Sequence, residues 1–107
     1  MSISYEEFKK CEMKMGTILV AETIEGSEKL LRLEVDFGDF QRQILSGIAK
    51  FYKPEDLIGK QLPFILNLEP RKMMGFESQG MLIATNDKNA AVLLLPERSV
   101  PLGADLC

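Results

Sequence analysis

Apolar and charged residues alternate most regularly between Leu31 and Phe37. The apolar positions are Leu31, Leu33, Val35 and Phe37, and the residues between them are Arg32, Glu34 and Asp36. This period of two predicts a β-strand with one buried face and one solvated face. Aliphatic and β-branched residues predict an earlier strand over 16–24, and residues 40–45 predict a later one. Turns at 25–27 and 38–39 then join the three strands into a meander.

The pattern changes after the meander. Residues 53–59 place a proline and two acids before a glycine, which predicts one short helix. The apolar run 62–68 predicts a strand, and Pro63 suggests that this strand begins at a sheet edge or a bulge. Residues 67–79 are expected to form a loop, and residues 80–84 predict the next strand.

Both ends of the chain carry further predicted elements. Ser4 and Glu7 have the spacing of a capping box, so we expect a short helix from about Tyr5 to Cys11. At the other end, a turn at 86–89 leads into a sixth strand over 90–95. These two segments extend a central unit of five strands.

The order of the predicted elements is β-β-β-α-β-β. It is typical of a five-stranded, all-β Greek-key barrel of the oligonucleotide-binding (OB) type, with the short helix between strands 3 and 4. The pattern alone leaves a β-sandwich open. A chain of 107 residues forms one domain. We expect the N-terminal helix over 4–12, the barrel over 14–84 and a C-terminal extension over 85–107.

Composition changes this picture mainly by what it excludes. The chain has no histidine, so it lacks the commonest general base and metal ligand, and Cys11 and Cys107 lie at opposite ends without a C-x-x-C spacing. Asp36 and Asp39 lie at a predicted turn, where acids have a structural role. We therefore expect no enzyme activity, no metal and no cofactor. No apolar run reaches about 20 residues and no signal peptide is visible, which favours a soluble cytoplasmic protein without a membrane partner.

Charge is distributed unevenly along the chain. The formal net charge of −3 argues against nucleic-acid binding if it is averaged over the whole molecule. Residues 1–40 hold five Lys or Arg against nine Asp or Glu, whereas residues 41–79 hold six against four. The central third is therefore the basic part of the chain.

Three stretches in this order resemble one family: residues 26–31 (GSEKLL), 45–50 (LSGIAK) and 67–81 (NLEPRKMMGFESQGM). They are similar to the tRNA-binding domain found at the C-terminus of many bacterial methionyl-tRNA synthetases and as a stand-alone dimeric tRNA-binding protein. The similarity runs from about Ser4 to Leu106. Related modules occur in cytokine-like tRNA-binding polypeptides of animals and in a secretion-associated, chaperone-like bacterial protein. Glu69 departs from the family, in which a basic residue is common at this position.

The resemblance implies a tRNA-binding surface on the barrel and its loops. The expected contact residues are Lys29, Arg42, Ser46, Lys50, Asn67, Arg71, Lys72, Ser78 and Met81. For several of them there is a simpler alternative from the residues alone: Arg71 and Lys72 as a solvated pair, Met81 as a core residue, and Asn67 as a cap for its own loop. Lys29 and Arg42 extend the cationic track only if they face the same side.

The function implied is a non-catalytic module that recognises the shape and backbone of tRNA, either as the C-terminal domain of a methionyl-tRNA synthetase or as a free factor. Its expected partners are tRNA, the catalytic part of the synthetase, and a second copy of the chain bound through the N-terminal helix and the C-terminal segment. The alternative function is a chaperone-like module of the same fold that grips apolar peptide.

Overall fold

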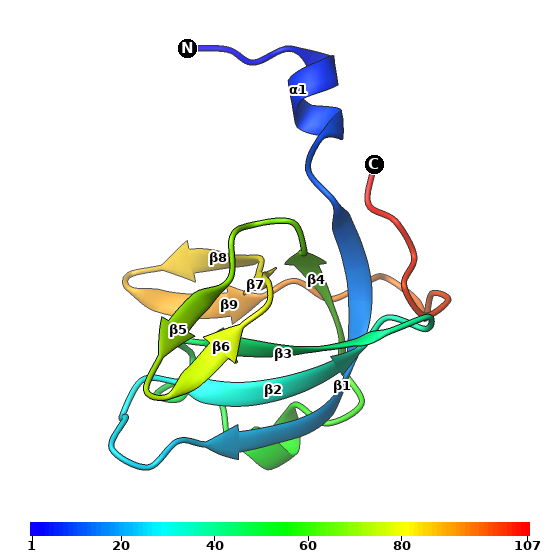
Figure 1. The fold of residues 1–107 in the computed structure, drawn as a ribbon. Helices are drawn as coiled ribbons and strands as arrows, with labels where there is room; N and C mark the ends of the chain where they lie inside the picture. The colour runs from blue at the N-terminus through cyan, green and yellow to red at the C-terminus, as the bar shows by residue number, and fades with distance from the viewer.

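The protein, described here by a computed structural model of residues 1–107, is built around one five-stranded antiparallel sheet (Figure 1). The order of the strands in the sheet is β3-β2-β1-β4-β7. Their bounds are Met13–Thr23 for β1, Leu31–Asp36 for β2, Gln41–Ser46 for β3, Gln61–Ile65 for β4 and Met81–Leu82 for β7. The outer strands β3 and β7 also contact each other, so the sheet curls into a nearly closed barrel. The predicted OB-type barrel is confirmed.

The interior of the barrel is lined by the apolar positions of the predicted alternation. Leu31, Leu33 and Val35 of β2 are fully buried, while the charged residues between them are half-buried. Phe64 of β4 is also fully buried, and its ring meets that of Phe37 edge to face at 5.6 Å between centroids. The alternating pattern thus assigned the two faces of β2 correctly.

Two small hairpins lie outside the main sheet. The first pairs β5 (Arg71–Met73) with β6 (Phe76–Ser78), and the second pairs β8 (Ala84–Asp87) with β9 (Ala90–Leu93). The predicted loop over 67–79 was therefore wrong for residues 71–78. Met74 and Gly75 both adopt positive φ, 51° and 82°, and they make the tight turn of the first hairpin. Methionine seldom adopts this conformation, so the sequence contains little indication of a turn here.

The strand predicted over 80–84 is interrupted. Only residues 81–82 join the barrel as β7, and β8 leaves it to pair with β9. The predicted sixth strand exists, but it belongs to this separate hairpin and ends at Leu93.

The two helical elements are short. Helix α1 spans Tyr5–Lys9 and begins with the predicted capping box, in which Ser4 and Glu7 exchange hydrogen bonds. The helix predicted between the third and fourth strands is a single 3₁₀ turn, η1, at Pro54–Asp56. No helix has both the length and the apolar character needed to cross a membrane.

Pro63 lies near the beginning of β4, where β1 pairs with residues 61–65 but β7 pairs only with Phe64 and Ile65, so the predicted position at a sheet edge is confirmed. Its partner on β1 is Met15, whose amide and carbonyl bond instead to Ala104 and Gly103 of the C-terminal segment. Met15 and Pro63 are therefore a pair without mutual hydrogen bonds, and the absent amide of proline costs no bond to β1.

Both termini meet beside the start of β1. Helix α1 stands away from the barrel, and the last residues of the chain rise toward its base (Figure 1). Asp105 pairs with Lys14 in an isolated bridge, and their side chains form an ion pair at 2.6 Å. A cavity of about 340 Å³ lies between the two termini, lined among others by Tyr5, Phe8 and Leu106.

Candidate nucleic-acid interface

The β5–β6 hairpin covers part of the outer face of β3. Leu45 pairs with Arg32 of β2, on the side of the sheet opposite the buried Leu33 and Ile44, yet it is only 5 % exposed. The hairpin shields it, and the buried hydroxyl of Ser78 accepts a hydrogen bond from the Leu45 amide at 3.0 Å. The candidate surface is therefore a hairpin fixed on the outside of a barrel strand.

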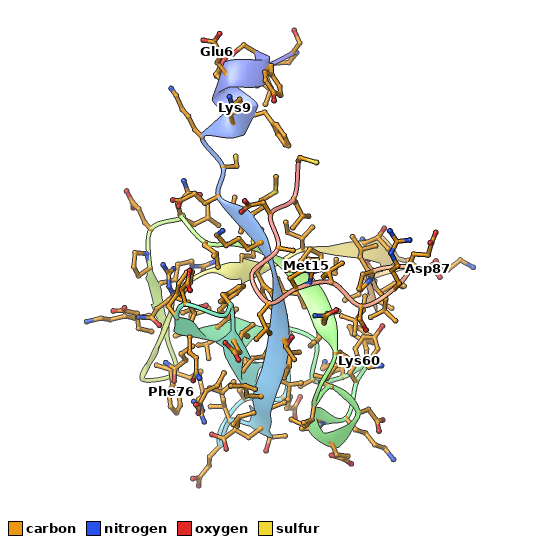
Figure 2. The ribbon with its side chains drawn as sticks, turned by 90° about the vertical axis from the view of Figure 1, so that its right-hand side faces the viewer. Glu6, Lys9, Met15, Lys60, Phe76 and Asp87 are labelled. Atoms are coloured by element: carbon orange, nitrogen blue, oxygen red, sulfur yellow. The ribbon has the colours of Figure 1, made fainter.

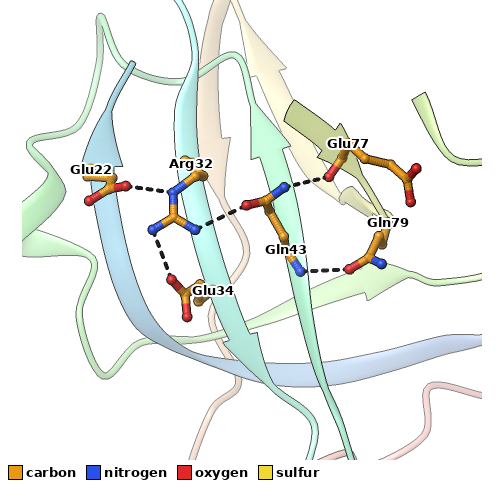
Figure 3. A network of polar contacts seen from close by, with 6 residues as sticks. All are labelled: Glu22, Arg32, Glu34, Gln43, Glu77 and Gln79. Carbon is orange, nitrogen blue, oxygen red and sulfur yellow. Dashed lines mark hydrogen bonds and ion pairs between the residues drawn. The ribbon is translucent and has the colours of Figure 1, made fainter. Parts of the chain in front are cut away.

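Gln43, two residues before Leu45 on β3, and Gln79, which follows β6, also hold the hairpin in place (Figure 3). The Gln43 amide donates to Oε1 of Gln79 at 3.1 Å, and the Gln79 amide donates to the carbonyl of Gln43 at 2.8 Å. Nε2 of Gln43 also donates to the carbonyl of Glu77 at 2.8 Å. Side chains thus replace the ladder bonds that a regular strand pairing would supply.

Arg32 is the centre of a polar network on this outer face (Figure 3). Its guanidinium donates to Glu22 at 2.6 Å, to Glu34 at 2.9 Å and to Oε1 of Gln43 at 3.1 Å. The hydrogen bond to Glu22 contributes most to raising the pKa of Arg32 above its usual value, against a smaller opposing effect of desolvation. Two carboxylates outweigh this single cation, so Arg32 positions its neighbours and offers no free positive charge.

Free positive charge is found on the hairpin itself. Arg71 and Lys72 of β5 are exposed, and neither takes part in an ion pair or a side-chain hydrogen bond. Neighbouring residues on a strand point to opposite faces. The two side chains therefore project on different sides of the hairpin.

A small cavity of about 140 Å³ lies between the hairpin, β3 and β7. Its lining consists of Leu45, Leu68, Glu69, Arg71, Met73, Ser78, Gly80 and Met81. Leu68 and Met81 are 46 % and 50 % exposed, so apolar side chains reach solvent at its opening. Three of the predicted contact residues, Arg71, Ser78 and Met81, are thus brought together at one site.

Ser78 and Asn67 contribute differently from what was expected of two RNA-contacting side chains. Ser78 is only 4 % exposed, and its hydroxyl is used twice, accepting from the Leu45 amide and donating to the Gly80 carbonyl at 3.0 Å. Asn67 accepts from the Glu12 amide at 2.9 Å and donates to the Lys10 carbonyl at 2.6 Å. Both side chains hold backbone segments in place.

Arg42 does not share the outer face with its neighbour Gln43. It pairs with Val35, and its Nη1 donates to the carbonyls of Leu66 and Gln79, each at 3.0 Å. The guanidinium also lies 5.1 Å from the ring of Phe40. Arg42 therefore closes the gap between β3 and the ends of the loop that carries the β5–β6 hairpin.

The remaining predicted residues lie around the other end of β3. Ser46 ends β3 and pairs with Leu31, and the carbonyl of Lys29 accepts from the Ala49 amide at 2.9 Å. Lys29 and Lys50 are exposed and form no ion pair. The loop after β1 and the loop after β3 are thus joined by a backbone hydrogen bond, and each loop carries one of these two exposed cations.

Several residues of this surface were missed by sequence reasoning. Gln43 and Gln79 are ordinary polar residues in the sequence, and their pairing depends on a hairpin that was not predicted. Leu68 was assigned to a strand or loop without a role, but it is an exposed apolar wall. The alternation that places Arg32 and Glu34 on one wet face was the single available signal for the network. Nowhere do three or more Cys, Asp or Glu side chains gather as metal ligands.

Comparison with known proteins places this geometry in a family. The family model described as "Putative tRNA binding domain" matches residues 13–105. A methionine–tRNA ligase from Methanothrix thermoacetophila is 51 % identical over 104 residues, which is 97 % of this chain and 15 % of that protein. The chain therefore spans about 15 % of the length of this curated relative.

Two solved structures share the fold over the whole chain. A methionyl-tRNA synthetase (MetRS)-related protein from Pyrococcus horikoshii superposes with a TM-score of 0.94 at 41 % identity, covering 100 % of this chain and 99 % of that one. The chaperone CsaA of Bacillus anthracis superposes with a TM-score of 0.90 at 32 % identity, covering both chains completely. With the family model matching most of its length and its barrel shared by these structures, the chain belongs to the tRNA-binding domain family.

Proposed function

We propose that this protein binds tRNA through the outer face of β2 and β3 together with the β5–β6 hairpin. The observation that carries the proposal is the pair of unpartnered cations, Arg71 and Lys72, on a hairpin held beside an apolar cavity in a member of this family. In OB-type barrels this sheet face and its flanking loops bind oligonucleotides. Unpaired cations attract phosphates, and exposed apolar side chains such as Met81 offer surface to a base.

In the proposed mode, the predicted residues divide into two groups. The exposed residues Lys29, Lys50, Arg71, Lys72 and Met81, with the half-buried Ser46, contact tRNA. Arg42, Asn67 and Ser78 act on it indirectly, because their polar atoms already bond to the protein. With few aromatic side chains for stacking and modest positive charge, recognition rests on the shape and backbone of folded tRNA.

A titration of bulk tRNA at several salt concentrations tests this function. Phosphate contacts release counterions, so the logarithm of the association constant falls linearly with the logarithm of salt concentration. We expect a slope corresponding to roughly three to five phosphate contacts. A slope near zero, or no binding in dilute buffer, would contradict the proposal.

We further propose that the chain is non-catalytic and raises the local concentration of tRNA for a methionyl-tRNA synthetase, either as part of the same protein or beside it. The similarity to a methionine–tRNA ligase supports this context. Fusing the chain to a synthetase that lacks such a region should lower the KM for tRNA and leave kcat unchanged, because the link raises the effective concentration of bound tRNA at the catalytic part. A change in kcat alone would argue for a direct role in the reaction.

A second copy of the chain is the proposed partner of the two termini. Helix α1 has no buried residue, Ile3 and Tyr5 are 65 % and 71 % exposed, and Leu94 and Leu95 are exposed in the C-terminal extension. Two small faces joined in a dimer bind one large ligand better than either alone. Sedimentation should show a dimer that Tyr5→Lys weakens, whereas a wild-type monomer at all concentrations would exclude it.

Apolar peptide is the second candidate ligand. The chaperone CsaA has the same fold at 32 % identity, and Leu68, Met74 and Met81 expose apolar surface on or next to the hairpin. This function predicts binding to unfolded polypeptide that survives high salt, because apolar contacts are not screened. Competition between tRNA and a reduced, unfolded protein at two salt concentrations separates the two functions.

A further inference from the structure

Two opposite charges line the 140 Å³ cavity without pairing with each other. Glu69 and Arg71 both belong to its wall, and neither takes part in any ion pair or side-chain hydrogen bond. Both residues are exposed, whereas the floor is formed by the nearly buried Leu45 and Ser78. The site is thus an apolar slot whose rim offers one carboxylate and one guanidinium.

The size of the slot limits what enters it. Pockets for drug-sized molecules have volumes of roughly 300 Å³ or more. A cavity of about 140 Å³ accepts a single flat ring system, with Leu68 and Met81 as walls on which its faces lie. Within a tRNA, such a group is one unpaired base turned out of its stack.

The carboxylate selects among the bases. An ionised carboxylate only accepts hydrogen bonds, and its two oxygens engage two adjacent donors at once. Guanine is the base whose Watson–Crick edge carries two adjacent donors, N1–H and the 2-amino group. Adenine and cytosine place an acceptor nitrogen beside their amino group, and uracil flanks its one N–H with two carbonyls. From this match we infer that the cavity is a guanine site, with Glu69 binding the base edge and Arg71 the adjoining phosphate.

This inference rests on the proposed tRNA binding and makes it more specific. On charge alone, Glu69 repels phosphates and weakens RNA binding by its presence. If Glu69 instead binds a guanine, its carboxylate strengthens the complex. The two roles predict opposite signs for the same substitution.

The test compares Glu69→Gln with Glu77→Gln in tRNA titrations at fixed, moderate salt. Glu77 lies on β6 of the same hairpin but does not line the cavity, and its carboxylate takes part in no hydrogen bond or ion pair. Both variants remove one negative charge from exposed or half-buried positions without ion pairs, so both should fold. We expect Glu77→Gln to bind tRNA as tightly as the wild type or more tightly, and Glu69→Gln to bind roughly five- to tenfold more weakly. If Glu69→Gln tightens binding as Glu77→Gln does, the guanine site is refuted while tRNA binding stands.

A second measurement does not depend on tRNA. The methyl groups of Met73 and Met81 line the cavity and report on it by NMR when methionine is ¹³C-labelled. Titration with guanosine 5′-monophosphate should shift both signals, and Glu69→Gln should abolish the shift. Equal shifts with the adenosine, cytidine and uridine monophosphates, or none with any of the four, would overturn the inference. Because this readout uses free nucleotides, it separates failure of the guanine site from failure of the proposed function.

Discussion

Arg42 and Gln79 are joined across the mouth of the barrel: Nη1 of Arg42 donates to the carbonyl of Gln79 at 3.0 Å. The same nitrogen donates to the carbonyl of Leu66 at 3.0 Å. Residues 66 and 79 mark the two ends of the segment that carries the β5–β6 hairpin. One cation therefore ties both ends of the proposed RNA-binding segment to β3.

Replacing Arg42 should lower stability without removing a phosphate contact. Arg42→Met leaves two backbone carbonyls without their donor, and hydrogen bonds to charged groups contribute about 1.5–3 kcal/mol. We expect a loss of that size in the free energy of unfolding, measured by urea denaturation. Arg98→Met is the matched control because the side chain of Arg98 is 87 % exposed, and it should change stability by less than about 0.5 kcal/mol.

The same variant tests how Arg42 acts on tRNA. If it positions the hairpin, Arg42→Met weakens binding but keeps the slope of affinity against salt. A slope reduced by about one unit would instead mean that Arg42 contacts a phosphate directly and extends the cationic track.

Removing the two free cations of β5 should change the salt dependence of tRNA binding but not the stability of the protein. Arg71 and Lys72 have no partners in the protein, so replacing both with alanine should leave stability nearly unchanged. The slope of log affinity against log salt should become shallower by about two units, because each cation is proposed to neutralise one phosphate.

The control for this pair removes the same charges elsewhere. Lys88 lies in the turn of the β8–β9 hairpin, next to Asp87, and Figure 2 places Asp87 and Phe76 of the β5–β6 hairpin on opposite sides of the molecule. Lys88→Ala combined with Arg98→Ala changes net charge equally but should alter the slope much less. Equal effects of the two double variants would mean that only overall charge matters.

The barrel could be predicted from the sequence because its information is local and periodic. The alternation around Leu33 places one face of β2 in the core, and the Ser4 capping box marks the start of α1. The β5–β6 hairpin was not predicted because its turn places Met74 at φ 51°. Methionine rarely adopts this conformation, so its presence in the sequence does not indicate a tight turn.

The candidate site was harder to predict because it depends on which atoms are already bonded. Ser78 and Asn67 have the right chemistry for RNA, and the sequence places them in the right segment. Only the folded structure shows that Ser78 is buried against Leu45 and that Asn67 bonds to Lys10 and Glu12. These partners lie 33 to 57 residues away along the chain, and no periodic pattern encodes them.

Asn67 should control the position of α1. Asn67→Ala removes the bonds to the Glu12 amide and the Lys10 carbonyl, which link the end of β4 to the connection between α1 and β1. We expect faster hydrogen exchange at the Glu12 amide, with a fall of about 1 kcal/mol in global stability. Asn86→Ala, at an exposed position on β8 without a side-chain hydrogen bond, should change neither quantity. Unchanged exchange at Glu12 in Asn67→Ala would show that this bond does not hold the connection.

The ion pair between Lys14 and Asp105 should make docking of the C-terminal segment depend on alkaline pH. The hydrogen bond to Asp105, 2.6 Å long, is the main reason that the pKa of Lys14 lies above its ordinary value of 10.5. The folded chain thus holds this proton more tightly than the unfolded chain. The resulting stabilisation is fully present below pH 10.5 and is lost as the pH rises through the folded-state pKa. The urea midpoints of the wild type and Lys14→Gln should therefore differ at neutral pH and converge above pH 10.5. A constant difference over the whole pH range would show that packing of the lysine stem, not its charge, holds the segment.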